Sequence, residues 1–168
     1  MKRLSLIRHA QADNLLSGHK DWDRALTRRG LLDAAEMAQR LKSQCVESQC
    51  MKPDLILSSP AIRARQTAEV FAKCFSKARL QLLEELYLCA PKPMLAAIQQ
   101  VEGNAMHLLV VGHNPGISEL ADQLAEDRRI DGMPTASIVT MQFEIKKWQA
   151  LLPAMGIDVE FDYPQRLA

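Results

Sequence analysis

Arginine and histidine residues follow three short apolar runs in this chain of 168 residues. Arg8 and His9 follow the first run, Arg63 comes shortly after the second, and His113 follows the third. Arginine keeps its charge and offers a planar fork of N–H donors, which matches the oxygens of a phosphate group. Imidazole can attack phosphorus through an unprotonated nitrogen and carry the phosphoryl group transiently. These residue types predict phosphoryl transfer, with His9 as the candidate nucleophile.

The rest of phosphoryl transfer is positioning and stabilisation of charge on three oxygens. Two arginines and a second, protonated histidine can provide this stabilisation, and His113 is the candidate for that histidine. The histidines lack the spacing of zinc ligands, so we expect no metal and no cofactor. His19, in a polar segment, and His107, at the start of an apolar run, are expected to be ordinary residues.

Four short apolar runs predict strands, because runs of this length are typical of strands buried in a sheet. They span residues 4–7, 55–57, 108–111 and 138–143. Between them, small and apolar residues recur at helical spacing. Thr27 is placed to cap the first of these helices.

Pairs of a capping residue and a proline mark the starts of two later helices. Ser59–Pro60 and Asn114–Pro115 each place a capping side chain before a proline that suits the first helical position. Helical spacing continues to Phe75 after the first pair and to Leu124 after the second. A further helix is expected over residues 94–100. Backbone N–H groups at such helix starts favour a bound anion.

Strands that alternate with helices predict an α/β fold, with three α/β/α layers around a mostly parallel sheet. A hairpin predicted from residues 138–143 and 148–152, with its polar turn at 144–147, makes that sheet mixed. No repeat or linker divides the chain, so we expect one domain over residues 1–168. Ligands of open α/β sheets bind beyond the carboxyl ends of the strands, which is where the candidate residues lie.

The composition argues against nucleic-acid and membrane partners. Lys and Arg total 21 against 20 Asp and Glu, so there is no overall positive field. No apolar run approaches the roughly 20 residues that span a bilayer. The four cysteines show no CxxC pairing and are expected to be reduced. We expect a cytoplasmic protein, and a monomer rather than an oligomer.

Three segments of the chain resemble the histidine phosphatase (phosphoglycerate mutase-like) superfamily. They are Leu6–Ala10, Ser58–Thr67 and Val111–Pro115, in that order. Asp23–Gly30 is similar to a further segment of the short SixA-type phosphohistidine phosphatase branch, so the resemblance runs from about Leu4 to Phe143. Superfamily members commonly have glycine after the histidine, where this chain has alanine, a departure that also occurs in the short branch.

The resemblance implies a phosphorylated His9 intermediate, held in a phosphate pocket of Arg8, Arg63 and His113. Arg24 is similar to a position near the pocket in the short branch, yet it can equally pair with Asp21 or Asp23, and we leave both interpretations open.

Hydrolysis of a phosphate ester profits from an acid that protonates the leaving oxygen. Glu84 and Glu85 are the candidates, because family members that act on esters commonly place a glutamate after a comparable strand, and we prefer Glu85 by its position before Leu86. Without such an acid a phosphoramidate is the more sensible substrate, because imidazole is a better leaving group than an alkoxide.

The leading interpretation is therefore a phosphatase that acts on phosphohistidine in a protein. A phosphatase for small phosphomonoesters is the second interpretation, and a phospho-ligand binding module without turnover is the third. The intact Arg8, His9, Arg63 and His113 argue against the third.

Overall fold

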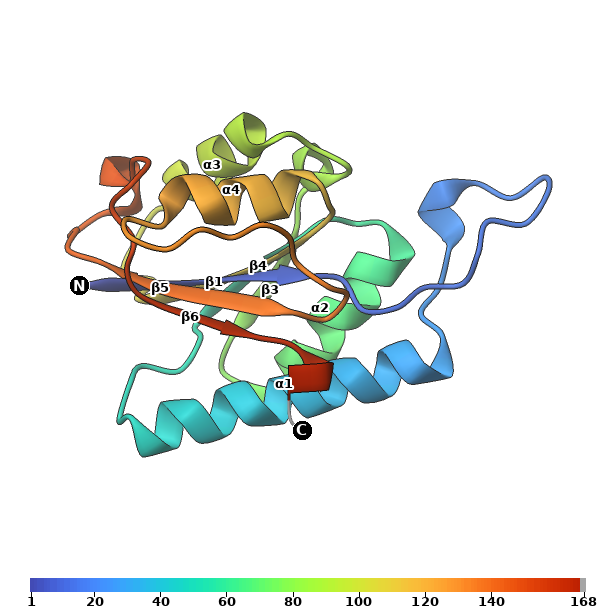
Figure 1. The fold of residues 1–168 in the computed structure, drawn as a ribbon, viewed down its shortest axis with the longest axis horizontal. Helices are drawn as coiled ribbons and strands as arrows, with labels where there is room; N and C mark the ends of the chain where they lie inside the picture. Colours follow the sequence, from blue (N-terminus) through green and yellow to red (C-terminus); the bar gives the residue numbers. More distant parts are fainter. Residues whose placement is uncertain (167–168) are drawn as a thin grey trace.

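The fold is seen in a computed structural model, which describes residues 1–166. One six-stranded sheet lies at its centre, in the order β3-β2-β4-β1-β5-β6 (Figure 1). The strands are β1 (Lys2–Arg8), β2 (Leu55–Ser58), β3 (Arg79–Leu82), β4 (His107–Gly112), β5 (Ile138–Phe143) and β6 (Ile157–Asp162). The first four strands pair in parallel, whereas β5 runs antiparallel to both β1 and β6. The predicted mostly parallel, mixed sheet is confirmed.

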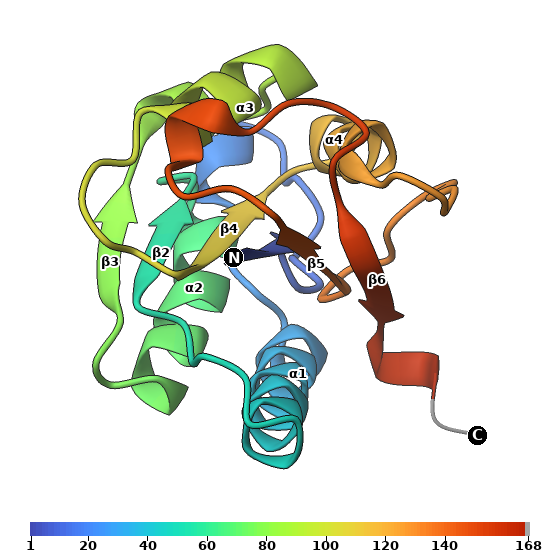
Figure 2. The same ribbon diagram turned by 90° about the vertical axis from the view of Figure 1, so that its left-hand side faces the viewer.

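Two pairs of helices cover the two faces of this sheet. The helices are α1 (Arg28–Glu47), α2 (Ile62–Cys74), α3 (Pro91–Gln99) and α4 (Gly116–Leu124). Figure 2, a view from one end, shows α1 and α2 on one face of the sheet and α3 and α4 on the other. The three-layer α/β/α architecture is therefore as predicted. Among residues 1–166, we find no helix with the length and apolar character needed to cross a membrane.

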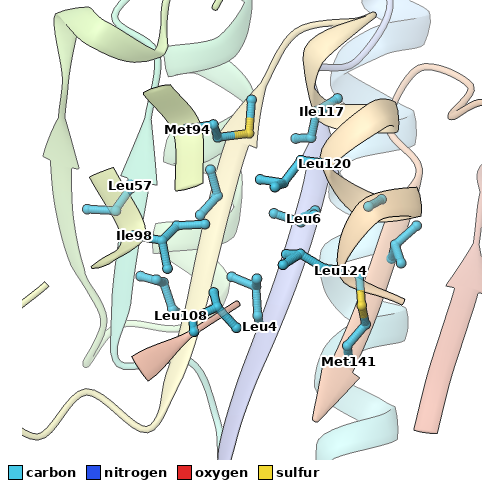
Figure 3. Packing of buried hydrophobic residues seen from close by; sticks show 14 of the residues in the cluster. Leu4, Leu6, Leu57, Met94, Ile98, Leu108, Ile117, Leu120, Leu124 and Met141 are labelled. Carbon is cyan, nitrogen blue, oxygen red and sulfur yellow. The ribbon is translucent and has the colours of Figure 1, made fainter. Parts of the chain in front are cut away.

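The strands at the centre of the sheet bury side chains on both faces, which explains their continuous apolar sequences. In β1, Leu4 and Leu6 belong to the core under α3 and α4, where Leu120 and Leu124 also lie (Figure 3). Ile7, one residue further, belongs to the core under α1 and α2. Removing one such fully buried leucine from water contributes about 1.5–3 kcal/mol.

The start of α1 confirms Thr27 as its cap, since the Thr27 hydroxyl accepts a hydrogen bond from the Gly30 N–H at 3.0 Å. The other two caps differ from prediction. Helix α2 begins at Ile62, so Pro60 precedes the helix rather than opening it. The Ser59 hydroxyl still accepts a bond from a backbone N–H of this turn, at 3.3 Å.

Helix α4 begins at Gly116, with Pro115 in the capping position and no capping side chain. The prediction that Asn114 caps this helix is wrong, because its side chain is used elsewhere. The Asn114 amide donates to the Met133 carbonyl, and its oxygen accepts from the Ser118 hydroxyl. Asn114 therefore joins the start of α4 to the segment before β5.

The predicted strand at residues 148–152 is also wrong. The buried Trp148 opens a short 3-10 helix, η3 (Trp148–Ala150), and its indole N–H donates to the Ala105 carbonyl at 2.9 Å. That helix covers the edge of the core instead of pairing with β5. The antiparallel partner of β5 is β6, in which Ile157, Val159 and Phe161 are less exposed than the residues between them.

Candidate active site

Three adjacent strands bring the candidate residues to one edge of the sheet. Arg8 at the end of β1 is in register with Gly112 at the end of β4, and Ser58 of β2 with Val111 of β4. The backbone N–H of His9 then donates to the Gly112 carbonyl at 3.1 Å. Residues that follow these strands are therefore held side by side, as the strand-end rule predicts.

The His9 ring is buried, and its two nitrogens have different partners. Nδ1 lies 2.8 Å from the carbonyl oxygen of Ala10. Because a carbonyl can only accept, Nδ1 carries the proton and Nε2 carries the lone pair. Nε2 receives the Nε–H of Arg63 at 3.3 Å, which agrees with this tautomer. His9 thus presents the nitrogen that a nucleophile needs.

Burial, together with the positive charges of Arg63, Arg8 and Arg24, lowers the pKa of His9 to about 4, although a hydrogen bond to Ala10 opposes this shift. His9 is consequently neutral at neutral pH. A neutral imidazole surrounded by three cations can attack an anionic phosphoryl group, because the cations attract the group without protonating the nucleophile.

His113 lies beside His9, with 5.2 Å between the ring centroids. Its Nε2 is 2.7 Å from the Ser59 hydroxyl, and its Nδ1 is buried without a hydrogen-bond partner. Burial and the charge of Arg63 lower the pKa of His113 to about 3, so the His113 imidazole is neutral near neutral pH. This differs from the protonated form expected from the sequence. We expect a bound phosphate dianion to raise that pKa, because it would offset the charge of the arginines.

Arg63 is almost fully buried, and all three of its guanidinium nitrogens are engaged. Nε–H faces His9, Nη1 donates to the main-chain oxygen of Asp21 at 2.8 Å, and Nη2 donates to Asp21 Oδ2 at 2.9 Å. Helix α2 carries Arg63 in its first turn, and Thr67 of the same helix accepts from the Ala10 N–H at 3.0 Å. The helix is therefore fixed to the chain that follows β1.

The guanidinium group of Arg8 has N–H donors that no protein group within residues 1–166 accepts. Its Nη1 donates to the Met133 carbonyl at 3.0 Å, while its Nε is buried without a hydrogen-bond partner. Burial lowers the pKa of Arg8 from its usual value. A buried donor without a partner is costly unless a ligand satisfies it. Arg8 Nε is such a donor, and His113 Nδ1 is a second buried atom without a partner, which suits a site that binds an oxyanion.

Asp21 is a site residue that sequence reasoning missed as such, having named it only as one possible partner of Arg24. It lies in a short 3-10 helix, η1 (Asp21–Asp23). Oδ1 accepts from Arg24 Nη1 at 3.1 Å, and Oδ2 accepts from the Tyr87 hydroxyl at 2.7 Å and from Arg63. Arg24 therefore pairs with Asp21 and also lies near His9 and His113. The polar loop around Asp21 carries no periodic pattern that could have marked it.

Tyr87 is the second missed residue, and a close backbone approach explains how it reaches the site. A Cβ at Gly116 would lie 2.0 Å from the Cys89 carbonyl oxygen, so the start of α4 can touch this segment only with glycine there. The Tyr87 ring then meets the His113 ring edge-on, with 5.6 Å between centroids, and the Trp22 ring at 4.7 Å.

Glu84 and Glu85 are exposed residues of a short 3-10 helix, η2 (Glu84–Leu86). Glu85 lines a cleft of about 310 Å³ beside Leu57 and Gln100, and none of the four candidate residues lines that cleft. The structure therefore brings Arg8, His9, Arg63 and His113 together but leaves Glu85 apart from them. Its role as a general acid stays a prediction.

The remaining titratable residues have other surroundings. His107 bonds to Ser5 and to the Met51 carbonyl, His19 is exposed, and the cysteines are free thiols. The residues described by the structure include no group of three His, Cys, Asp or Glu side chains arranged to hold a metal ion.

A buried neutral histidine, two arginines and a second histidine are the groups that a phosphate-binding site with a histidine nucleophile requires. The family model described as the histidine phosphatase superfamily (branch 1) matches residues 4–87. An uncharacterized protein of Mycobacterium tuberculosis is 31% identical over 168 residues, which cover 95% of this chain and 100% of that protein. The chain therefore belongs to the histidine phosphatase superfamily, and this membership indicates phosphatase activity.

Two further similarities lie in the SixA-type branch. Phosphohistidine phosphatase SixA of Escherichia coli K12 is 28% identical over 142 residues, covering 83% of this chain and 84% of that protein. The crystal structure of SixA from Agrobacterium tumefaciens matches with a TM-score of 0.74 at 28% identity, over 85% of this chain and 92% of that one. The predicted membership and fold are confirmed.

Proposed function

We propose that this phosphatase removes the phosphoryl group from a phosphohistidine in a protein. His9 Nε2 attacks phosphorus, the P–N bond of the substrate breaks, and its electron pair leaves with the substrate imidazole, which takes a proton. Water then attacks phosphorus on His9, the P–Nε2 bond breaks, and inorganic phosphate leaves. Arg8, Arg63 and His113 bind the phosphoryl oxygens in both steps.

This proposal rests mainly on the protonation and hydrogen bonding of the two acidic groups at the site, Asp21 and Tyr87. Burial would raise the pKa of Asp21, but hydrogen bonds from Tyr87, Arg24 and Arg63 lower it to about 2. Asp21 is therefore ionised and cannot give a proton to a leaving group. Burial and the bond to Asp21 raise the pKa of Tyr87, whose hydroxyl already donates to that carboxylate.

An alkoxide leaving group needs a proton donor much more than an imidazole does, because imidazole takes a proton near neutral pH. A site whose hydrogen-bonded carboxylate is ionised therefore favours a phosphoramidate such as phosphohistidine. The similarity to phosphohistidine phosphatase SixA of Escherichia coli supports the same substrate. The four free thiols agree with a reducing compartment, and we propose that the protein acts in the cytoplasm as a monomer.

A substrate panel tests the proposal. The chain is given a phosphotransfer domain phosphorylated on histidine, p-nitrophenyl phosphate, a sugar phosphate and a nucleotide at matched concentrations. We expect phosphohistidine to be hydrolysed at least about tenfold faster than the sugar phosphate, which lacks a good leaving group. Faster release of phosphate from the sugar phosphate would overturn the proposal.

Glu85→Gln sharpens this test, with Glu84→Gln as the matched control at the neighbouring exposed position. If phosphohistidine is the substrate, neither variant changes its turnover by more than about twofold, because that leaving group needs no carboxylic acid. A large loss of ester hydrolysis in Glu85→Gln alone supports a phosphatase for small phosphomonoesters instead.

A further inference from the structure

The guanidinium group of Arg63 has two edges, and the structure uses them differently. The two Nη atoms point to Asp21, one to its main-chain oxygen and one to Oδ2. The Nε–H points to Nε2 of His9. Because the guanidinium is rigid and planar, fixing the Nη end also fixes the direction of the Nε–H.

Asp21 is itself held at both carboxylate oxygens. Arg24 Nη1 donates to Oδ1, and the Tyr87 hydroxyl donates to Oδ2. Arg24 is in turn fixed by its Nε, which donates to the Asp13 carbonyl at 2.7 Å. An aspartate with a pKa of about 2 keeps its charge at every pH at which His9 is neutral.

The charge of Asp21 also matters for Arg63, whose side chain is only 2% exposed. A buried guanidinium without a counter-ion is costly, and it would turn toward any acceptor within reach. The acceptor within reach here is the lone pair of His9 Nε2, the atom that must attack phosphorus. Asp21 accepts from both Nη atoms, so that only the Nε–H of Arg63 faces His9.

We propose that Asp21 is a positioning residue for phosphoryl transfer, which holds the Nη end of Arg63 so that its Nε–H edge meets the phosphoryl oxygens at His9. This inference rests on the proposed roles of His9 and Arg63. Asp21 contacts no reacting atom in this scheme. It acts through Arg63, and Arg24 and Tyr87 act through Asp21.

Asp21→Asn is the first test, because asparagine keeps the shape of the side chain and removes its charge. The matched control is Asp23→Asn, two residues along the same 3-10 helix, where the side chain is exposed. With p-nitrophenyl phosphate as substrate, we expect Asp21→Asn to lower kcat by about tenfold or more, with a smaller change in KM. Asp23→Asn stays within about twofold. A kcat for Asp21→Asn within twofold of the wild type overturns the inference.

A double-mutant cycle separates positioning from a merely structural role. Arg63→Lys removes the fork on which Asp21 acts, so Asp21→Asn added to Arg63→Lys lowers kcat by less than about twofold further. Losses that multiply across the two sites would show that Asp21 acts by another route and would overturn the inference.

Tyr87→Phe provides a second route if Asp21→Asn does not fold. It removes one donor to Oδ2 and keeps the ring beside His113. We expect kcat to fall by about threefold, with no further fall in the Arg63→Lys background. An unchanged kcat contradicts the inference. His9→Gln distinguishes the two proposals. Full activity of His9→Gln would contradict the role of His9 as nucleophile. Loss of activity in His9→Gln together with normal kinetics of Asp21→Asn would contradict only the role of Asp21.

Discussion

The two ends of β1 each place an arginine beside a histidine, in different surroundings. At the start of the strand Arg3 is in register with His107 of β4. Both nitrogens of His107 are engaged, Nε2 with the Ser5 hydroxyl and Nδ1 with the Met51 carbonyl, each at 2.8 Å. At the other end Arg8 precedes His9, whose Nδ1 is held by a carbonyl while its Nε2 meets only the Arg63 N–H.

The comparison shows that a lowered pKa does not by itself mark a functional histidine. Burial is the main cause in both cases, and it brings the pKa of His9 and the pKa of His107 to about 4. The two histidines differ in their second nitrogen. In His107 a neutral hydroxyl occupies it, whereas in His9 it carries a lone pair amid cationic groups. A ring nitrogen whose lone pair faces a cationic group, rather than a lowered pKa, indicates a chemical role.

Exchanging each histidine for glutamine gives the largest expected difference between the two ends. His9→Gln should lower phosphate release from p-nitrophenyl phosphate by about a thousandfold or more, because the nucleophile is lost. His107→Gln should keep activity within about threefold, because it contacts no substrate. Steady-state kinetics on both variants test this. Normal turnover by His9→Gln would remove the covalent mechanism.

The arginines at the two ends give the next largest difference. Arg8→Ala should lower kcat/KM by about a hundredfold, because a buried N–H donor and a positive charge that acts on His9 are both lost. Arg3→Ala removes a buried arginine that lies 3.8 Å from Glu160 at the far end of the strand, and should leave kcat/KM within about twofold. Equal losses in the two variants would mean that Arg8 acts through folding and not through phosphate.

The stability of the fold should respond in the opposite sense. His107→Gln cannot satisfy both the Ser5 hydroxyl and the Met51 carbonyl in the same geometry, so we expect the free energy of unfolding to fall by about 1–3 kcal/mol. Urea denaturation followed by circular dichroism measures this. His9→Gln serves as the comparison, and a larger loss there would reverse the assignment of structural and chemical roles.

The regular part of the molecule could be predicted from the sequence, because buried strands and amphipathic helices leave periodic patterns. The four residues at the strand ends followed from the rule for open sheets. Asp21 could not be found in this way, because it reaches Arg63 across 42 residues from an irregular loop. The second strand of the C-terminal pair was misplaced because the apolar residues around Trp148 serve the core through a 3-10 helix.

The pH dependence of stability should show the smallest difference. An unfolded histidine has a pKa near about 6.5, and that of folded His107 is about 4. Between these values the unfolded chain binds a proton that the folded chain does not, so stability is full above about pH 6.5 and is lost as pH falls toward 4. Each such histidine adds up to about 1.4 kcal/mol per pH unit to the slope.

The unfolding free energy should therefore rise less steeply between about pH 4.5 and 6 in His107→Gln than in the wild type, because the contribution of one titrating histidine to the slope is lost. His19→Gln, at an exposed position, is the control and should keep the wild-type slope. Urea denaturation at several pH values gives the slopes. Inorganic phosphate should flatten the wild-type slope as well, because a bound phosphate anion favours protonated His113 in the folded state. A phosphate effect that disappears in His107→Gln but persists in Arg8→Ala would place the anion at the wrong end of β1.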